Sequence, residues 1–408
     1  MNVKWEKNQL PQFLISDIKD CLKVGDDGGV SYTIGVEFQI DALFSKVMHR
    51  YDLEESVLYE NFDSAVKSVF KSNQLTKPDD ILSEFRNKCD ENLRVKNKYY
   101  LLTSISLKSS LIPKRRTING CAIRFYSEIP NKYKKSRSES IERHKELELS
   151  EQNDYVFVTV SVTAPDVNTA FKKSIAALDI IRSILQLNFK KSIQFLSLQD
   201  QHKYSSNSIL SLGQVHTLHS PNGAMAWRNV WYEPDFNDKG PIKVRNFSLT
   251  ESNLTGWIKS LNENPFSEHL LVSLASYIRA LDHKDQEFRF MKLWSVIERL
   301  VKTDDTKMII KRVSFFYENR AVTKDVLYSL RQARNINVHA GLKPFNVEMK
   351  NFKLCSFIED LFRFFISNPF KYDNLQKVID FISLSTELQS IDQQIKNLKK
   401  VKKFIGEG

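Results

Sequence analysis

The chain contains few glycines and few cysteines, and this scarcity argues against several kinds of site. Among its 408 residues are 12 glycines and 4 cysteines. No two cysteines form a C-x-x-C pair, and none lies near a histidine at zinc-ligand spacing, so the sequence predicts no metal site. We expect buried or free thiols in a reducing cytoplasm. The motif G-x-x-x-x-G-K-[ST] is also absent, which argues against a P-loop ATPase.

Long apolar runs and the common hydrolase motifs are missing as well. No stretch of about 18 uninterrupted apolar residues occurs, and the segment MNVKWEKNQL lacks the apolar centre of a secretory signal. Neither H-E-x-x-H nor G-x-S-x-G is present. His216 and His219 have H-x-x-H spacing without nearby acids or cysteines, so we interpret them as structural residues. We therefore expect a cytoplasmic protein with no membrane partner, no metal and no cofactor.

What the chain does have is positive charge on an ordinary globular composition. Lysine and arginine number 60 against 49 aspartates and glutamates, a formal net charge of +11. Such a balance suits RNA or DNA first and an anionic membrane surface second. A lysine-rich, solvated surface without a polyanionic partner explains the same number equally well. The 41% hydrophobic content is sufficient for a core, and the length favours two or three domains.

The first part of the chain mixes strand and helix patterns. Alternation of apolar and polar residues predicts strands, and apolar residues at helical spacing predict helices. The Asn119-Gly120 dipeptide is a turn signal. Residues 131–152 are almost free of large apolar side chains, which indicates an exposed loop or a short solvated helix. The predicted strands are 30–40, 99–107, 117–126 and 155–163, and the predicted helices are 54–71 and 170–187.

From about residue 251 the strand patterns end and helical periodicity dominates. The predicted fold class is therefore α+β, with a mixed α/β region at 1–250 that may be two subdomains. An all-α bundle at 251–372 follows it, and a basic helix at 373–408 ends the chain. The predicted helices of this part are 266–283, 285–302, 304–319, 323–340, 346–368 and 373–403.

The helix predicted at 323–340 carries polar residues that interrupt its apolar stripe. At about 100° per residue, Arg334 and Asn337 fall on the apolar side, whereas Asn335 and His339 fall roughly opposite. Burying an unpaired guanidinium is costly, so Arg334 needs a partner. Three remain open: a carboxylate on a neighbouring helix, with Glu298 the best candidate, a wet subunit interface, or a bound phosphate.

The segment Arg334-Asn-Ile-Asn-Val-His339 fits R-x4-H, with asparagine directly after the arginine, and resembles the signature of the HEPN ribonucleases. The upstream stretch FRFMKLWSVIERLVK is similar to the second helix of the Apea-like HEPN subgroup, found in bacterial anti-phage defence proteins. The resemblance covers about 120 residues, from roughly 262 to 370. It implies an all-α HEPN bundle that cleaves RNA without a metal, and an amino-terminal region that senses a trigger.

The resemblance also implies roles for individual residues. The 2′-hydroxyl of the RNA attacks the adjacent phosphorus and leaves 2′,3′-cyclic phosphate and 5′-hydroxyl ends. His339 acts as general acid or base, and Arg334 stabilises the transition state. Asn335 orients the phosphate or a hydroxyl, and Glu298 positions Arg334 or His339. HEPN domains commonly dimerise with both motifs in a shared cleft, so we expect a homodimer, RNA as substrate, and a phage-derived protein or nucleic acid as trigger in abortive infection.

Further substrate contacts are predicted from basic stretches. Candidate RNA contacts are Lys114, Arg115 and Arg116, which lie between two predicted strands. Asn337, on the motif helix, is a further candidate. The tail places Leu388, Ile391, Ile395 and Leu398 at short coiled-coil spacing, beside a lysine cluster that includes Lys399 and Lys400. This tail is a dimer brace, an RNA-binding arm, or a terminal helix docked on its own domain with a solvated lysine face. The docked helix is the preferred interpretation, because the heptad pattern is short. Solvated loops are the simpler interpretation of the other basic stretches.

Two rival functions stay open. The first is a non-catalytic HEPN module that binds nucleotides, nucleic acid or a partner, although the presence of both Arg334 and His339 argues against it. The basic surface also suits a DNA-binding regulator, but no clear helix-turn-helix is present.

Overall fold

The computed structural model describes residues 3–6, 11–25, 29–33, 35–51, 53–72, 77–196, 206–238, 240–340 and 344–406, without the side chains of 32, 189–196 and 336–340. The chain forms two compact units. Unit 1 comprises residues 1–100, 161–173 and 218–227, and unit 2 comprises 101–160, 174–217 and 228–408. Each unit is described by itself below.

Unit 1 contains four helices around an aromatic core. Its helices are α1 (Gln12–Cys21), α2 (Val36–Phe44), α3 (Glu55–Lys71) and α4 (Pro78–Arg94). Two short antiparallel pairs flank them, β1 (Val3–Trp5) with β4 (Val47–His49), and β2 (Leu22–Val24) with β3 (Val30–Tyr32). Phe44, Phe62 and Phe85 pack ring against ring in the core. The predicted helix at 54–71 is confirmed as α3.

The strand predicted at 30–40 is wrong beyond Tyr32. Gly35 has φ +102°, in the left-handed region, and α2 begins directly after it. Val36, Ile40 and Leu43 are buried on one face of α2 at spacings of four and three. A short apolar pattern fits both periods, and here packing against the other helices selects the helical one.

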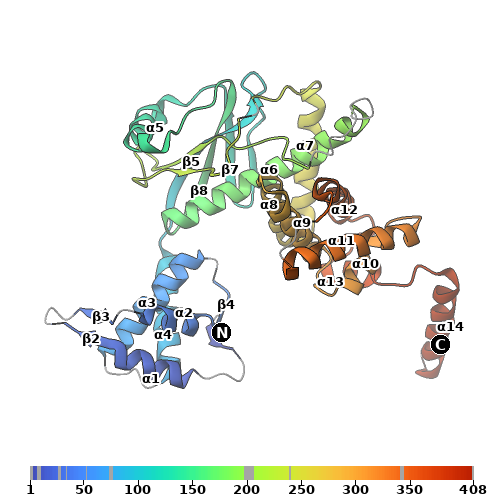
Figure 1. Ribbon diagram of the computed structural model, residues 1–408, viewed down its shortest axis with the longest axis horizontal. Coiled ribbons are helices and arrows are strands. Elements are labelled where there is room, and N and C mark those ends of the chain that lie inside the picture. The colour runs from blue at the N-terminus through green and yellow to red at the C-terminus, as the bar shows by residue number, and fades with distance from the viewer. Residues whose placement is uncertain are drawn as a thin grey trace. The chain divides into compact units, whose positions relative to one another are not determined.

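A six-stranded sheet lies mainly in unit 2 (Figure 1). The strand order is β10-β9-β5-β8-β7-β6. The predicted strands at 99–107, 117–126 and 155–163 are confirmed, the second as two strands around a turn in which Asn119 and Gly120 both have positive φ. The bounds are β5 (Asn97–Lys108), β6 (Arg116–Ile118), β7 (Cys121–Tyr126), β8 (Tyr155–Ala164), β9 (Val215–His219) and β10 (Trp231–Tyr232).

The charged stretch 131–152 is more ordered and more buried than its composition indicates. It forms α5 (Asn131–Arg143) and a 3-10 turn, η1 (Lys145–Leu147). Arg137 is 1% exposed, pairs with Glu151 at 2.5 Å, and donates hydrogen bonds to the carbonyls of Leu102 and Val215. This arginine therefore fastens α5 to the sheet. The predicted helix at 170–187 is confirmed within the longer α6 (Val167–Leu196).

The remaining part of unit 2 is helical, as predicted. Helices α8, α9 and α12 pack together, and α11 packs against α9 and α10 (Figure 1). The predicted domain boundary near residue 250 falls inside unit 2, within α7. No described helix is long and apolar enough to cross a membrane. The bounds are α7 (Phe247–Glu263), α8 (Ser267–Asp282), α9 (Gln286–Leu300), α10 (Thr306–Ser314), α11 (Arg320–Ala340), α12 (Val347–Ser367), α13 (Leu375–Ile382) and α14 (Leu388–Phe404).

Two features of this region differ from the prediction. Helix α7, Phe247–Glu263, is not among the predicted helices, and Asn246 caps it by accepting a hydrogen bond from the Leu249 N–H. The single tail helix predicted at 373–403 is two helices, separated between Ile382 and Leu388. Serine and threonine in SLSTE compete for backbone hydrogen bonds there, which ends α13. Helix α14 has no buried residue, so the alternative of a docked terminal helix is wrong.

Candidate functional site

The arginine of the R-x4-H motif lies near the carboxyl end of α11. Leu327, Leu330 and Ala333 are buried and hold this helix against its neighbours. Arg334 follows them and is half-buried. Its Nε atom is buried and has no hydrogen-bond partner among the residues that the structure describes. A guanidinium N–H without a partner is unfavourable in a poorly solvated position, and an acceptor brought by a ligand would satisfy it.

Glu298 on α9 is near enough to Arg334 for their charges to interact. Burial raises the pKa of the Glu298 carboxyl, while a hydrogen bond from Trp294 and the charge of Arg334 act in the opposite direction. The Trp294 indole N–H donates to Glu298 Oε1 at 2.7 Å. Glu298 and Arg334, which the sequence analysis paired although they are 36 positions apart, therefore lie close enough to interact between α9 and α11. Trp294 orients the carboxylate, which the sequence prediction did not anticipate.

The other motif residues are only partly described. Asn335 is half-buried beside Arg334 on α11. The backbone stays helical through Asn337 and His339 to Ala340. The side chains of Asn337 and His339 lie outside the described residues, so their predicted roles stay predictions.

Arg331 is a candidate residue that the sequence analysis missed. It precedes Arg334 by three positions on α11, so both side chains project from neighbouring turns of one face. Like Arg334, it is half-buried with a buried Nε that has no hydrogen-bond partner, and Arg320 at the start of α11 shares this feature. The R-x-x-R spacing was visible in the sequence, but the resemblance drew attention to R-x4-H alone.

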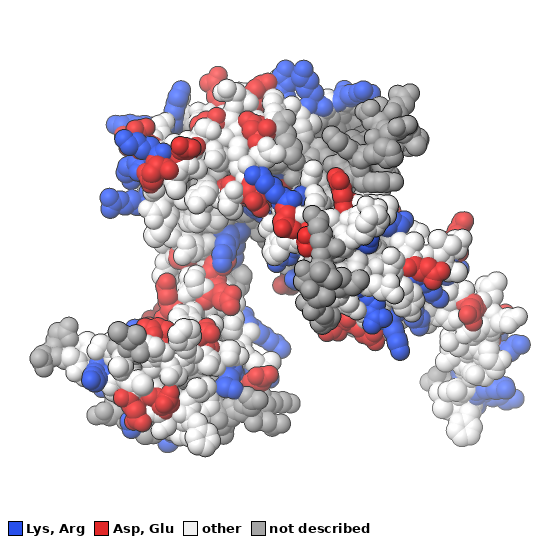
Figure 2. All heavy atoms as spheres, viewed as in Figure 1, with Lys and Arg blue, Asp and Glu red and all other residues white. Residues whose placement is uncertain are grey.

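The predicted basic contacts outside α11 divide into paired and exposed residues. Arg116 is paired, with Nη2 2.6 Å from Glu251 Oε2 and 3.1 Å from Thr255 Oγ1. This ion pair joins the β6 region to α7, although the Nε atom of Arg116 is also buried without a partner among the described residues. Lys114 and Arg115 are exposed. Lys399 and Lys400 are exposed on α14, where basic side chains gather in Figure 2.

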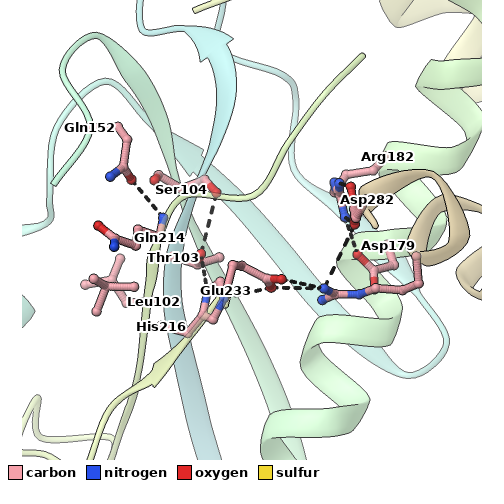
Figure 3. A network of polar contacts seen from close by, with 12 residues as sticks. Leu102, Thr103, Ser104, Gln152, Asp179, Arg182, Gln214, His216, Glu233 and Asp282 are labelled. Carbon is pink, nitrogen blue, oxygen red and sulfur yellow. Dashed lines mark hydrogen bonds and ion pairs between the residues drawn. The ribbon is translucent and has the colours of Figure 1, made fainter. Parts of the chain in front are cut away.

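A second charged cluster, which we call the buried network, joins the sheet to two helices of unit 2 (Figure 3). Arg182 on α6 contacts Asp179 at 2.7 Å and Asp282 at 2.6 Å. Arg279 on α8 contacts Asp179 at 2.5 Å and Glu233 at 2.9 Å. These five residues satisfy each other's charges, so the cluster fastens α6 and α8 to the segment after β10.

His216 extends the buried network into the sheet. Its Nε2 lies 3.0 Å from Glu233 Oε1, and its Nδ1 lies 2.7 Å from Thr103 Oγ1 on β5. Thr103 and His216 are 0% and 1% exposed, so a substrate cannot reach this threonine and histidine. Their geometry agrees with the interpretation of His216 as structural.

The titration of the buried network follows from its packing. Burial lowers the pKa of His216 and keeps its imidazole neutral. Burial alone would raise the pKa of Glu233, but the hydrogen bond with His216 and the charge of Arg279 outweigh it and hold this pKa well below its usual range. Because both pKa values are lowered, the buried network stabilises the fold more at neutral pH than in acid.

Arg331 and Arg334 on α11, whose Nε atoms have no hydrogen-bond partner among the described residues, form the candidate site together with Glu298 and Trp294, and these arginines suit an anionic ligand. No protein-family model, no curated protein and no solved structure matches this chain.

Proposed function

We propose that this protein is a metal-independent endoribonuclease whose catalytic groups are Arg334 and His339. It cleaves RNA by attack of the 2′-hydroxyl on the adjacent phosphorus. The P–O2′ bond forms as the P–O5′ bond breaks, one proton leaves the 2′-hydroxyl, and one joins the departing 5′-oxygen. The products carry 2′,3′-cyclic phosphate and 5′-hydroxyl ends.

One observation favours this proposal over a purely structural role for the motif. The Nε atoms of Arg331 and Arg334 are buried without a hydrogen-bond partner on neighbouring turns of α11. The guanidinium fork matches the oxygens of a phosphate diester, which would satisfy these N–H groups and take negative charge from a transition state. The excess of basic residues in the chain favours a polyanionic substrate.

Each residue has a distinct part in the proposed reaction. His339 moves the proton, because an imidazole titrates near neutral pH. Arg334 binds the phosphate and stabilises the phosphorane-like transition state, with Arg331 as a second phosphate contact. Glu298, oriented by Trp294, positions Arg334 through their charge interaction. Asn335 orients the phosphate or a hydroxyl.

The proposal includes a setting and an assembly. The enzyme acts as a homodimer, with the motifs of both copies in one cleft, and its activity is the toxic step of a bacterial anti-phage defence. The amino-terminal residues sense a phage-derived protein or nucleic acid. These parts depend on the HEPN resemblance of Phe288 to Lys302 and of Arg334 to His339.

The test is incubation of the purified chain with mixed RNA in EDTA, with and without extract of phage-infected cells. We expect fragments that end in cyclic phosphate from the wild type and none from Arg334→Ala or His339→Ala. Lys324→Ala, which removes an exposed cation from the same helix, should cleave like the wild type.

Two results would count against this function. Absence of cleavage under all conditions, together with retained RNA binding, would favour the non-catalytic module. Cleavage that survives in both motif variants would assign the activity to another site or to a contaminant. Far-UV circular dichroism and thermal unfolding of each variant establish that any loss is not a loss of fold.

A further inference from the structure

A polar cavity of about 270 Å³ lies in unit 2, beside the buried network and away from the α11 motif in sequence. It is formed by the segments before β9 and after β10, the end of α8 and the start of α9. Its volume is a little below the roughly 300–1,000 Å³ of typical small-molecule sites, so it suits a small ligand. The lining residues that matter here are Ser208, Ser211, Glu233, Asp235, Lys284 and Arg289.

Arg289, in the first turn of α9, is the most unusual residue of this lining. It is 2% exposed. Its Nη1 donates to Ser206 Oγ at 3.0 Å and to Gln286 Oε1 at 3.2 Å, and its Nη2 donates to the His283 carbonyl. Its Nε is buried and has no hydrogen-bond partner among the described residues. Burial lowers the pKa of this guanidinium, although the charges of Asp282, Glu348 and Asp285 act in the opposite direction.

The carboxylates that line the same cavity contact other basic residues. Glu233 is bound by Arg279 and His216, and Asp282 is bound by Arg182. Asp235 is half-exposed and lies 3.7 Å from His283 Nδ1. Among the described residues, none of these carboxylates forms an ion pair with Arg289. The chain thus buries a guanidinium whose Nη atoms donate to neutral acceptors, while its Nε–H has no acceptor among the described residues.

We propose that this cavity binds the phosphate group of a small polar ligand, with Arg289 as its anchor. The unpartnered Nε and the neighbouring Nη2 form a fork for two oxygens of the anion. Lys284 and the hydroxyls of Ser208 and Ser211 supply donors for a third oxygen, one more than a carboxylate possesses. The remainder of the ligand faces Glu233 and Asp235, so it carries hydrogen-bond donors. This site does not depend on the proposed ribonuclease function.

The experiment is titration calorimetry and thermal unfolding of the full chain with inorganic phosphate, adenosine 5′-monophosphate, and adenosine as the form without phosphate. We expect the phosphate-containing probes to bind and to raise the melting temperature above a chloride control of equal ionic strength. Adenosine alone should bind at least tenfold more weakly than its monophosphate. Stronger binding of the monophosphate than of phosphate identifies a phosphate ester, and equal binding identifies phosphate itself.

Variants separate this site from folding and from the α11 motif. Arg289→Lys keeps the charge but loses the fork, so it should weaken phosphate binding by about tenfold. Lys284→Ala, at the exposed rim, should weaken phosphate binding by roughly threefold. It tests the site even if Arg289→Lys does not fold. Lys292→Ala on the same helix should bind like the wild type, and the phosphate binding that persists in Arg334→Ala is the part that belongs to the cavity. Absence of phosphate binding by the wild type, or unchanged binding by both cavity variants, would overturn the proposal.

Discussion

Unit 2 contains two groups of arginines that the chain treats in opposite ways. In the buried network, Arg182 and Arg279 each contact two or three carboxylates, and the carboxylates are shared between them. On α11, Arg331 and Arg334 have buried Nε atoms without a hydrogen-bond partner among the described residues, and the charge of Glu298 acts on Arg334. Burial alone does not separate the groups, because Arg182 is 0% exposed whereas Arg279 is half-buried like Arg331 and Arg334.

The difference teaches where to look for function in a charged protein. A guanidinium whose N–H groups all pair with carboxylates has nothing left to offer a ligand. A guanidinium with an unpartnered N–H keeps its capacity to bind an anion. The paired group therefore stabilises the fold, and the incompletely paired group is the one for which we propose a phosphate contact.

The largest effect should come from breaking the buried network. Arg182→Met leaves Asp179 and Asp282 short of a partner, and removal of one member of a buried ion pair typically costs about 3–5 kcal/mol of unfolding free energy. Arg334→Ala should cost less than about 1 kcal/mol. Urea unfolding of both variants measures the contrast. Equal losses would show that Arg334 is as structural as Arg182.

The second largest effect on stability should come from acid, which weakens the same network. The folded-state pKa of His216 lies below its unfolded value of 6.5, so its contribution to stability is lost as pH falls below that value. The depressed pKa of Glu233 adds a second loss below its unfolded value of 4.5. The melting temperature should therefore fall from pH 6.5 downward, with a shallower slope between pH 6.5 and 5 in His216→Gln. Parallel curves would contradict the role given to this imidazole.

The α11 arginines should affect RNA binding more than stability. In a His339→Ala background, Arg331→Ala and Arg334→Ala should each weaken single-stranded RNA binding by about tenfold. Each should also reduce the slope of log K against log salt by about 0.7 if one phosphate contact is lost. Fluorescence anisotropy at several salt concentrations measures both quantities, with Lys324→Ala as the matched cation control. Unchanged slopes would place the RNA elsewhere.

Glu298 should have a smaller effect, with a defined sign. Its pKa is raised mainly by burial, so the stability linked to its proton is complete below pH 4.5 and lost as pH rises through the folded-state pKa. Relative to Glu298→Gln, the wild type should be more stable at pH 4 than at pH 7. Thermal unfolding at the two pH values tests this sign, and an opposite sign would mean that Arg334 dominates the environment of Glu298.

The smallest effects on stability should come from α14, whose charges are neither paired in the core nor half-buried. Leu398 is 67% exposed, so Leu398→Glu should change the unfolding free energy by less than about 0.5 kcal/mol. The double variant Lys399→Ala, Lys400→Ala should lower RNA affinity less than either α11 arginine variant. A large stability loss in Leu398→Glu would reveal that this helix is covered by a second copy of the chain.

Local pattern was sufficient for much of the fold. The valine-rich run at 155–163 and the helices α8, α9, α11 and α12 were predicted because their periodicity is long and unambiguous. Asn119-Gly120 determined its own turn, since both residues tolerate positive φ. The segment at 30–40 was misassigned because a short apolar pattern fits strand and helix alike. The break before α14 was missed because the apolar spacing continues on both sides of it.

From the sequence alone come the R-x4-H motif on α11, the prediction that it marks a HEPN-like site and the choice of Glu298 as partner of Arg334, because these depend on residue identity and helical spacing. Tertiary structure alone decided which arginines are already paired. Asp179 meets Arg279 across 100 positions of sequence, and no local pattern encodes that meeting. The same holds for Arg289, whose Nε lacks a partner only because of how α9 packs. Whether a charge is used for folding or left for a ligand is a property of its neighbours in space.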